Sequence, residues 1–86
     1  MPYIHYQFSS RGSGTAIVHL TGVESDVVLF DRRNYDLFRQ GASPSYRAGG
    51  HYTSSPARLP FASGGEWHIV IIPGWGGQVT AQVELV

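Results

Sequence analysis

The end of the chain alternates between apolar and polar side chains, a pattern typical of a β-strand that borders a core. Val79, Ala81, Val83 and Leu85 are apolar, whereas Thr80, Gln82 and Glu84 between them are polar. Successive side chains of a strand point to opposite faces, so one face of this segment is expected to pack on a core while the other meets water. The preceding segment 67–72 is largely apolar on both faces and is followed by Pro73-Gly74. We therefore predict that the last 23 residues, 64–86, form a β-hairpin.

Short strand-like segments separated by turn residues recur through the rest of the chain. They are residues 3–8, 15–21, 26–31, 45–53 and 57–61. The pair Gly49-Gly50 indicates a bulge or a close backbone approach, and Pro60, which has no N–H to donate, indicates an edge strand or a bulge. This spacing predicts an all-β fold, a small antiparallel β-sandwich or partly open barrel of about six to eight strands. With 86 residues, the chain is expected to form one domain over 1–86.

Residues 31–41 have a different pattern. Asp31 suits a helix N-cap and Gly41 the position after a helix end, while Tyr35 and Phe38 are three residues apart and so share a helix face. We predict one short helical segment near 32–40 that covers an open end of the sheets. Its arginines, Arg32 and Arg33, together with Tyr35, form a recognition surface in one interpretation; in the other, the aromatic side chains close the core.

Composition narrows the classes of function. The chain has no cysteine, which rules out disulfides, thiol catalysis and cysteine-ligated zinc, and which favours the cytoplasm. Six arginines and no lysine balance six acidic residues, so there is no basic field for nucleic acid. The first residues lack a basic flank followed by an apolar run, which argues against a signal peptide, and no apolar run reaches membrane-spanning length.

The sequence contains no recognisable catalytic or metal motif. Its histidines, at positions 5, 19, 51 and 68, lack metal-ligand spacing. His5 and His19 lie on the polar faces of two predicted strands, and the rings would approach one another if those strands paired, with His68 joining from a third. No nucleophile elbow, phosphate-binding loop or carboxylate pair is recognisable. We predict no metal, no cofactor and no enzymatic activity.

Aromatic and arginine side chains are the candidate binding residues. Trp67 is in phase with Ile69 and Ile71 and is expected in the core, whereas Trp75 lies in a glycine-flanked turn. An indole in such a turn stacks on a sugar, enters a partner's pocket, or folds back over the end of the sheets. Four residues with polar-tipped side chains lie beside the glycine pair. In one interpretation they form an adaptable contact surface, and in the other they have a structural role. They are Tyr46, Arg47, His51 and Tyr52.

The order of several short motifs resembles a known family. Tyr46-Arg47-Ala48-Gly49-Gly50 is followed by Ser55-Pro56-Ala57-Arg58-Leu59 and then by Gly65-Glu66-Trp67-His68. This order resembles the small bacterial family called domain of unknown function 1883, over nearly the whole chain. The resemblance implies a compact β-sandwich that occurs alone or joined to signalling domains such as the TIR type, and it carries over no site residue. The segment 72–75 departs from it, because a more polar sequence is expected there.

The leading interpretation is therefore a non-catalytic interaction or sensor module. It would act through surface aromatics and arginines on a protein partner or on itself, and the resemblance implies a role in bacterial signalling or defence. The alternative is a carbohydrate or small-ligand binding domain in which Trp75 and the tyrosines stack on the ligand. If the last strand lies at an edge, its outer backbone N–H and C=O groups are unpaired, and it has no lysine that would disfavour pairing with another chain. This favours a homodimer by strand addition.

Overall fold

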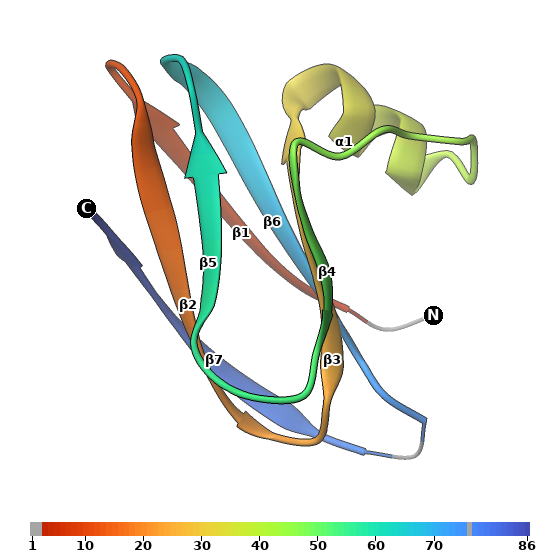
Figure 1. The fold of residues 1–86 in the computed structure, drawn as a ribbon. Coiled ribbons are helices and arrows are strands. Elements are labelled where there is room, and N and C mark those ends of the chain that lie inside the picture. Colours follow the sequence, from red (N-terminus) through yellow and green to blue (C-terminus); the bar gives the residue numbers. More distant parts are fainter. Residues whose placement is uncertain (1–2, 76) are drawn as a thin grey trace.

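Two antiparallel sheets face each other in the molecule (Figure 1). The structure, a computed structural model, describes residues 3–75 and 77–86. One sheet has the strand order β1-β6-β3-β4, formed by β1 (Ile4–Ser10), β6 (Gly65–Pro73), β3 (Ser25–Asp31) and β4 (Ala48–Tyr52). The other has the order β5-β2-β7, formed by β5 (Ala57–Phe61), β2 (Gly14–Gly22) and β7 (Val79–Leu85). The predicted all-β class is confirmed, and the arrangement is a sandwich rather than a closed barrel.

The core lies between the sheets and is built from alternate residues of each strand. From β6 it takes Trp67, Ile69 and Ile71, which are all buried, as the period of two predicts. The indole N–H of Trp67 donates to the carbonyl of Ser63 at 3.2 Å, so the largest side chain of the core leaves no polar atom unpaired. Full burial of one such aliphatic side chain contributes about 1.5–3 kcal/mol of apolar transfer free energy.

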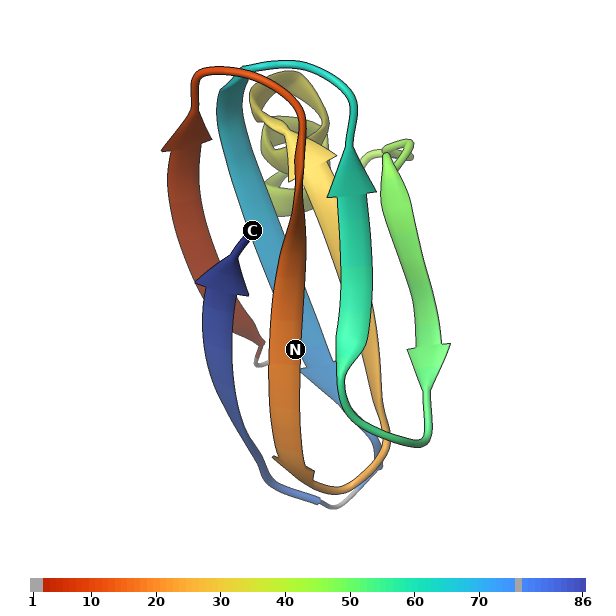
Figure 2. The ribbon, with the colours of Figure 1, turned by 60° about the vertical axis from the view of Figure 1, so that its left-hand side comes forward.

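The predicted hairpin over 64–86 is wrong. Strand β6 pairs with β1 and β3, whereas β7 pairs with β2 in the opposite sheet, so the chain crosses between sheets after Pro73 (Figure 2). The physical reason lies in the faces of the strands. Both faces of β6 are apolar and it occupies the middle of a sheet, while β7 has one apolar face and lies at an edge. The crossing segment is tied to the turn between β2 and β3, where Gly74 N–H donates to the carbonyl of Glu24 at 2.9 Å.

The helix α1 (Arg32–Arg39) confirms the predicted helical segment but not its location. The carboxylate of Asp31 accepts from the backbone N–H of Asn34 at 2.8 Å, which is the N-cap contact that the sequence indicated. Gly41 follows the helix with a φ of 76°, a conformation that favours glycine. Instead of closing an end of the sandwich, α1 packs on the outer face of the four-stranded sheet. There Tyr35 and Phe38 form a second apolar cluster with Phe30 and Val70.

The edge predicted at Pro60 and the close backbone approach predicted at Gly49-Gly50 are both confirmed. Pro60 lies on β5 at the edge of the three-stranded sheet and is exposed. Gly49 on the edge strand β4 has a φ of 140°, and a Cβ there would lie 2.3 Å from the carbonyl oxygen of Val27. The glycine therefore permits a close approach of β4 to β3 that no other residue allows.

Candidate functional site

Two histidines meet on the outer face of the four-stranded sheet. His5 comes from β1 and His68 from β6, and the register pairs His5 with Val70, so the two rings are diagonal neighbours on one face. The Nε2 of His5 lies 2.8 Å from Nδ1 of His68, and Nε2 of His68 lies 2.6 Å from the carboxylate of Glu66. Glu66 and His68 are two residues apart on β6, which puts them on the same face.

These contacts form a directed chain of hydrogen bonds. The carboxylate of Glu66 can only accept, so Nε2 of His68 donates to it. In the neutral His68 ring, Nδ1 is then an acceptor, and Nε2 of His5 donates to it. The remaining nitrogen of a neutral His5 is a free acceptor. His68 is buried with both ring nitrogens satisfied, and His5 is the exposed end of the chain.

Tyr35 of α1 covers the two histidines. Its ring stacks on His5 and on His68 with centroid separations of 4.3 Å each and interplanar angles of 11° and 4°. Burial of the phenol, with its 3.3 Å hydrogen bond to Tyr3, raises the pKa of Tyr35 to about 12. The guanidinium carbon of Arg39 lies 5.9 Å from the centre of the same ring, within cation–π range. We call His5, Tyr35, Glu66 and His68 the histidine cluster.

A hollow of about 390 Å³ opens beside the histidine cluster. Besides the cluster, its lining consists of Gln7, Arg32, Asp36 and Arg39. Loss of water around the ring lowers the pKa of His5, and the neighbouring His68 and the charge of Arg39 lower it further. His5 therefore favours its neutral form at neutral pH.

The other two histidines do not join this cluster. His19 lies in the opposite sheet and its Nε2 is 2.8 Å from the carboxylate of Glu84, where both side chains are about half exposed. His51 on β4 lies 2.8 Å from Asp26, and this hydrogen bond raises its pKa. The predicted approach of His5 to His68 is present, then, and that of His19 is not. Within residues 3–75 and 77–86, no group of three or more His, Cys, Asp or Glu side chains is arranged so that it could hold a metal ion.

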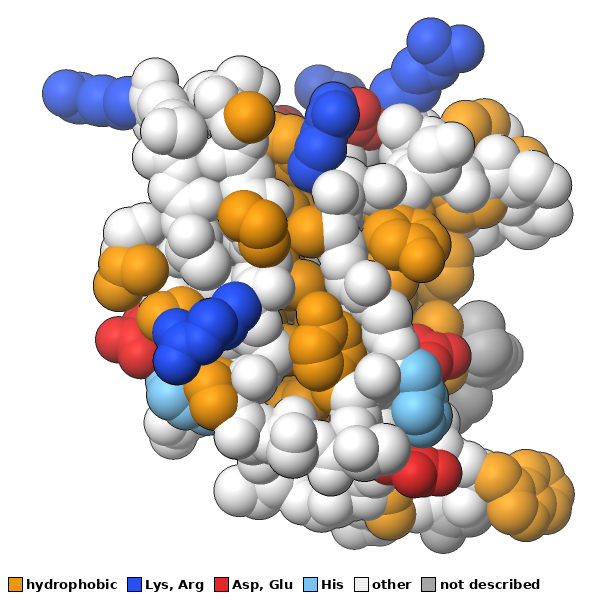
Figure 3. Space-filling view, in the orientation of Figure 1, with side chains coloured by type: hydrophobic (Ala, Val, Ile, Leu, Met, Phe, Trp, Pro, Cys, Tyr) orange, Lys and Arg blue, Asp and Glu red, His pale blue; other side chains and the backbone are white. Residues whose placement is uncertain are grey.

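A second hollow, of about 370 Å³, lies between α1, β3 and β4. Its floor and walls are mainly apolar, and its rim carries the ion pair of Asp26 and His51. We call it the apolar groove; its apolar members are Val28, Phe30, Phe38, Tyr46 and Ile72. Tyr46 is 55% exposed, so it stands at the rim rather than in the core. In the space-filling view, hydrophobic side chains reach the surface between sparse charged ones (Figure 3).

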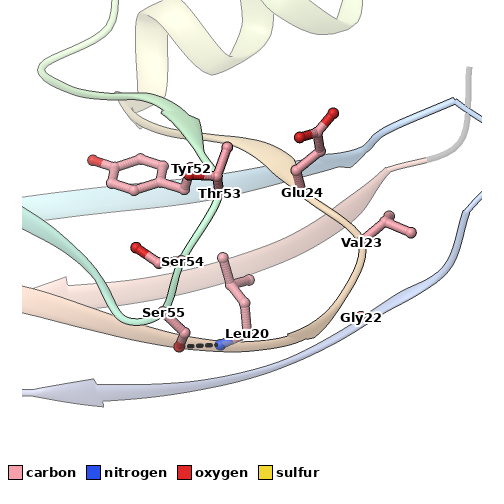
Figure 4. A pocket seen from close by; sticks show the side chains of 8 residues that line it. All are labelled: Leu20, Gly22, Val23, Glu24, Tyr52, Thr53, Ser54 and Ser55. Atoms are coloured by element: carbon pink, nitrogen blue, oxygen red, sulfur yellow. Dashed lines mark hydrogen bonds between the residues drawn. The ribbon is translucent and has the colours of Figure 1, made fainter.

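Tyr52 lies on β4 and packs against the core with part of its side chain. It is half-buried against the core and lines a hollow of only about 80 Å³ at the end of the sandwich. Figure 4 shows this hollow, where the hydroxyl of Ser55 accepts from the backbone N–H of Leu20 at 2.8 Å. A volume of this size has room for a few water molecules and not for an organic ligand.

The remaining predicted site residues are spread over the surface. Trp75 is fully exposed in the turn after β6. Arg32 lines the hollow of the histidine cluster, and its neighbour Arg33 is exposed on the same helix without lining that hollow. Arg47 lines a small recess of about 120 Å³ that it shares with Asp31 and Tyr46. The structure thus brings Tyr46 and His51 together at the apolar groove, and it keeps Trp75 apart from both hollows.

Sequence reasoning missed Glu66, Asp36 and Arg39 as members of a site. One signal was available for Glu66, because Glu-x-His on a strand places both side chains on one face. Asp36 and Arg39 become neighbours of the histidines only through the docking of α1 on the sheet, which no local pattern encodes.

The family comparison agrees with this architecture. The sequence model of the family described as domain of unknown function (DUF1883) matches residues 1–86, the whole chain. The chain belongs to the DUF1883 family. It matches no curated protein and no solved structure. In the described part of this DUF1883 domain, no helix has the length and apolar character needed to cross a bilayer.

Proposed function

We propose that this DUF1883 domain is a non-catalytic recognition module whose apolar groove binds a segment of a partner protein. The observation that carries the proposal is the half-exposed Tyr46 at the rim of a mainly apolar hollow on the outer face of a sheet. A hollow of about 370 Å³ is within the size range of ligand pockets and accepts one large side chain. Tyrosine is among the residues that dominate binding energy at interfaces.

Charge at the rim indicates the chemistry of the partner. His51 lies between Asp26, at 2.8 Å, and Glu24, at 3.7 Å. With His51 neutral, the two carboxylates give this end of the groove two negative charges. With His51 protonated, one net negative charge remains. The occupant we propose is therefore an apolar side chain of the partner with a lysine or arginine close to it in sequence. Complementary charge of this kind selects the partner and its orientation.

The proposal treats the histidine cluster as non-catalytic. His68 is buried and both its ring nitrogens are engaged, so it has no free position from which to act on a substrate. A bacterial and cytoplasmic setting, with a role in signalling or defence, is part of the proposal. It rests on the character of the resembled family and on the absence of cysteine.

A second candidate function rests on one further observation, the fully exposed indole of Trp75. An indole in this position suits stacking on the face of a sugar or another small ligand. Titration of a glycan panel, followed by tryptophan fluorescence, tests this candidate. A saturable shift that is absent in Trp75→Ala supports ligand binding at the turn.

Selection from a displayed peptide library tests the leading proposal. We expect enriched peptides to share an apolar or aromatic anchor with a neighbouring lysine or arginine, and we expect Tyr46→Ala to weaken them about tenfold or more. Trp75→Ala is the matched control, because it removes an exposed aromatic side chain that does not line the groove and should leave binding unchanged. Enriched peptides without a basic residue, or peptides lost in Trp75→Ala and kept in Tyr46→Ala, would contradict the proposal.

A further inference from the structure

The hollow beside the histidine cluster collects cationic groups from different elements. Arg32 and Arg39 reach it from the two ends of α1, and His5 reaches it from β1. Guanidinium groups present several donors in a planar fork that matches phosphate and carboxylate oxygens. This arrangement is separate from the apolar groove, which shares no lining residue with it and has an acidic rim.

The charges that line the hollow are balanced until a proton is added. Arg32 and Arg39 are opposed by Asp36 and Glu66, and both histidines are uncharged when neutral. Glu66 is already engaged by His68 at 2.6 Å, and the Asp36–Arg39 pair is loose, at 4.0 Å, with both side chains well exposed. One proton on His5 therefore makes the hollow net positive and changes its free nitrogen from an acceptor into a donor.

We propose that this hollow binds a phosphate group, held by Arg32 and Arg39 and completed by His5 in its protonated form. Each of the three donor groups can meet a different oxygen of a phosphate, whereas a carboxylate has only two oxygens, in one plane, to share among them. The volume of about 390 Å³ also leaves room for an organic group attached to the phosphate. Free phosphate and a phosphomonoester share this chemistry.

The surrounding groups determine the direction of the pH dependence. Glu66 and His68 face His5 from β6, and Arg32, Tyr35, Asp36 and Arg39 face it from α1. In the free protein, burial, His68 and Arg39 lower the pKa of His5. A bound anion favours the protonated ring, so binding takes up a proton. Affinity is therefore expected to fall as pH rises above the pKa of His5 in the free protein, by about tenfold for each pH unit until the bound form also loses its proton.

The test is an NMR titration of the histidine ring nitrogens and the backbone amides at constant ionic strength. The probes are inorganic phosphate, O-phosphoserine as a small phosphomonoester, and sulfate, which does not titrate in this pH range and so isolates the proton on His5. We expect saturable shifts at His5 and Arg32, and tighter binding at pH 6 than at pH 8 with all three probes. Tighter binding of O-phosphoserine than of phosphate identifies a phosphomonoester as the ligand, and the reverse identifies the free anion.

Matched variants separate a site from general charge. Arg32→Ala and Arg39→Ala should each weaken binding about tenfold, whereas Arg33→Ala, which removes the neighbouring charge outside the hollow, should not. His5→Gln should bind sulfate weakly and without the pH dependence. All four positions are exposed, and circular dichroism checks that each variant is folded. Shifts that sodium chloride reproduces, equal loss in Arg33→Ala and Arg32→Ala, or sulfate binding that does not change with pH would overturn the proposal.

Discussion

His68 is a polar side chain in a place that packing alone would fill with an apolar one. It lies on the outer face of β6 beneath Tyr35 and is only 4% exposed. Burial of an imidazole is tolerable only when its nitrogens have partners, and here His5 and Glu66 supply them. The stability of this part of the sheet therefore depends on a chain of hydrogen bonds as well as on apolar contact.

Removal of Glu66 tests this dependence. In Glu66→Ala, the buried Nε2–H of His68 loses its acceptor, and we expect a loss of about 1–3 kcal/mol in the free energy of unfolding. Glu84→Ala is the control, because it breaks the same kind of pair with His19 at the surface and should cost less than about 1 kcal/mol. Urea unfolding of both variants measures the difference. Equal losses would show that the burial of His68 has no energetic consequence.

The lowered pKa of His5 predicts a pH dependence of stability. The folded chain binds the His5 proton less tightly than the unfolded chain, whose histidine has a pKa of about 6.5. Its contribution to stability is therefore complete above that value and decreases as the pH falls through 6.5 towards the lower pKa of the folded state.

The pKa of His51 is raised, so its contribution to the pH dependence of stability has the opposite sign to that of His5. The comparison must therefore cancel the effect of His51. Unfolding midpoints of the wild type and of His5→Gln, measured between pH 8 and pH 5, achieve this, because both proteins retain His51. We expect the wild type to lose stability relative to the variant as the pH falls. A constant difference would contradict the prediction.

At the scale of elements, α1 is the piece that creates both hollows. It contributes Tyr35 and Arg39 to one and Phe38 to the other, and its start is held by Asp31. The hydrogen bond from the backbone of Asn34 lowers the pKa of Asp31. This contribution to stability is present above the unfolded value of about 3.9 and disappears as the pH falls through the lower folded value.

Substitution of the cap tests the link between α1 and the sites. Asp31→Ala should cost about 1 kcal/mol, within a usual range of about 0.5–2, whereas Asp31→Asn retains a cap and should cost less. Tyr35 belongs to α1, so loosening of the helix also affects the histidine cluster. In Asp31→Ala, the rate of hydrogen exchange should therefore increase more at the amides of α1 than at those of β2. Uniform exchange throughout the molecule would show that α1 does not move as a separate unit.

The sequence was sufficient for features that depend on local period and insufficient for those that depend on docking. Alternation predicted Trp67 in the core and the exposed face of β7, because burial repeats every two residues along a strand. The partner of β6 was misjudged because a proline–glycine turn is compatible with a hairpin and with a crossing between sheets. The contact between His5 and His68 joins residues 63 apart and requires the register of β1 on β6.

At the scale of the whole molecule, β7 lies at the edge of the three-stranded sheet, which is the condition on which association by strand addition depends. It pairs with β2 and its other side faces β1, where the hydroxyl of Tyr6 donates to the carbonyl of Ala81 at 2.8 Å. The N–H of Leu20, opposite Ala81, points towards Ser55 on the other side of β2, which leaves Ala81 facing outward. Tyr6 therefore engages the carbonyl of Ala81, one of the backbone groups with which a second chain would pair if it added as a strand.

We predict a homodimer by strand addition at β7, in equilibrium with monomer. Tyr6→Phe frees the carbonyl of Ala81 and should strengthen association. Ala81→Pro removes the outward-facing backbone N–H of the same residue from the edge and should weaken it. Sedimentation velocity over a range of concentrations measures both effects. A strict monomer at high concentration in the wild type and in Tyr6→Phe would refute the dimer.

Among the described strands, neighbours in sequence almost never become neighbours in a sheet. The one such pair, β3 and β4, is separated by α1 and the segment that follows it, and every other ladder joins strands with at least one further strand between them. No short β-hairpin can therefore form early and act as a template for the other strands. Long loops must close first, and the conformational entropy lost in closing them is offset only when the paired strands have formed. Despite its small size, the domain should refold in about milliseconds to seconds, as all-β proteins with distant pairings do, and stopped-flow tryptophan fluorescence would record it.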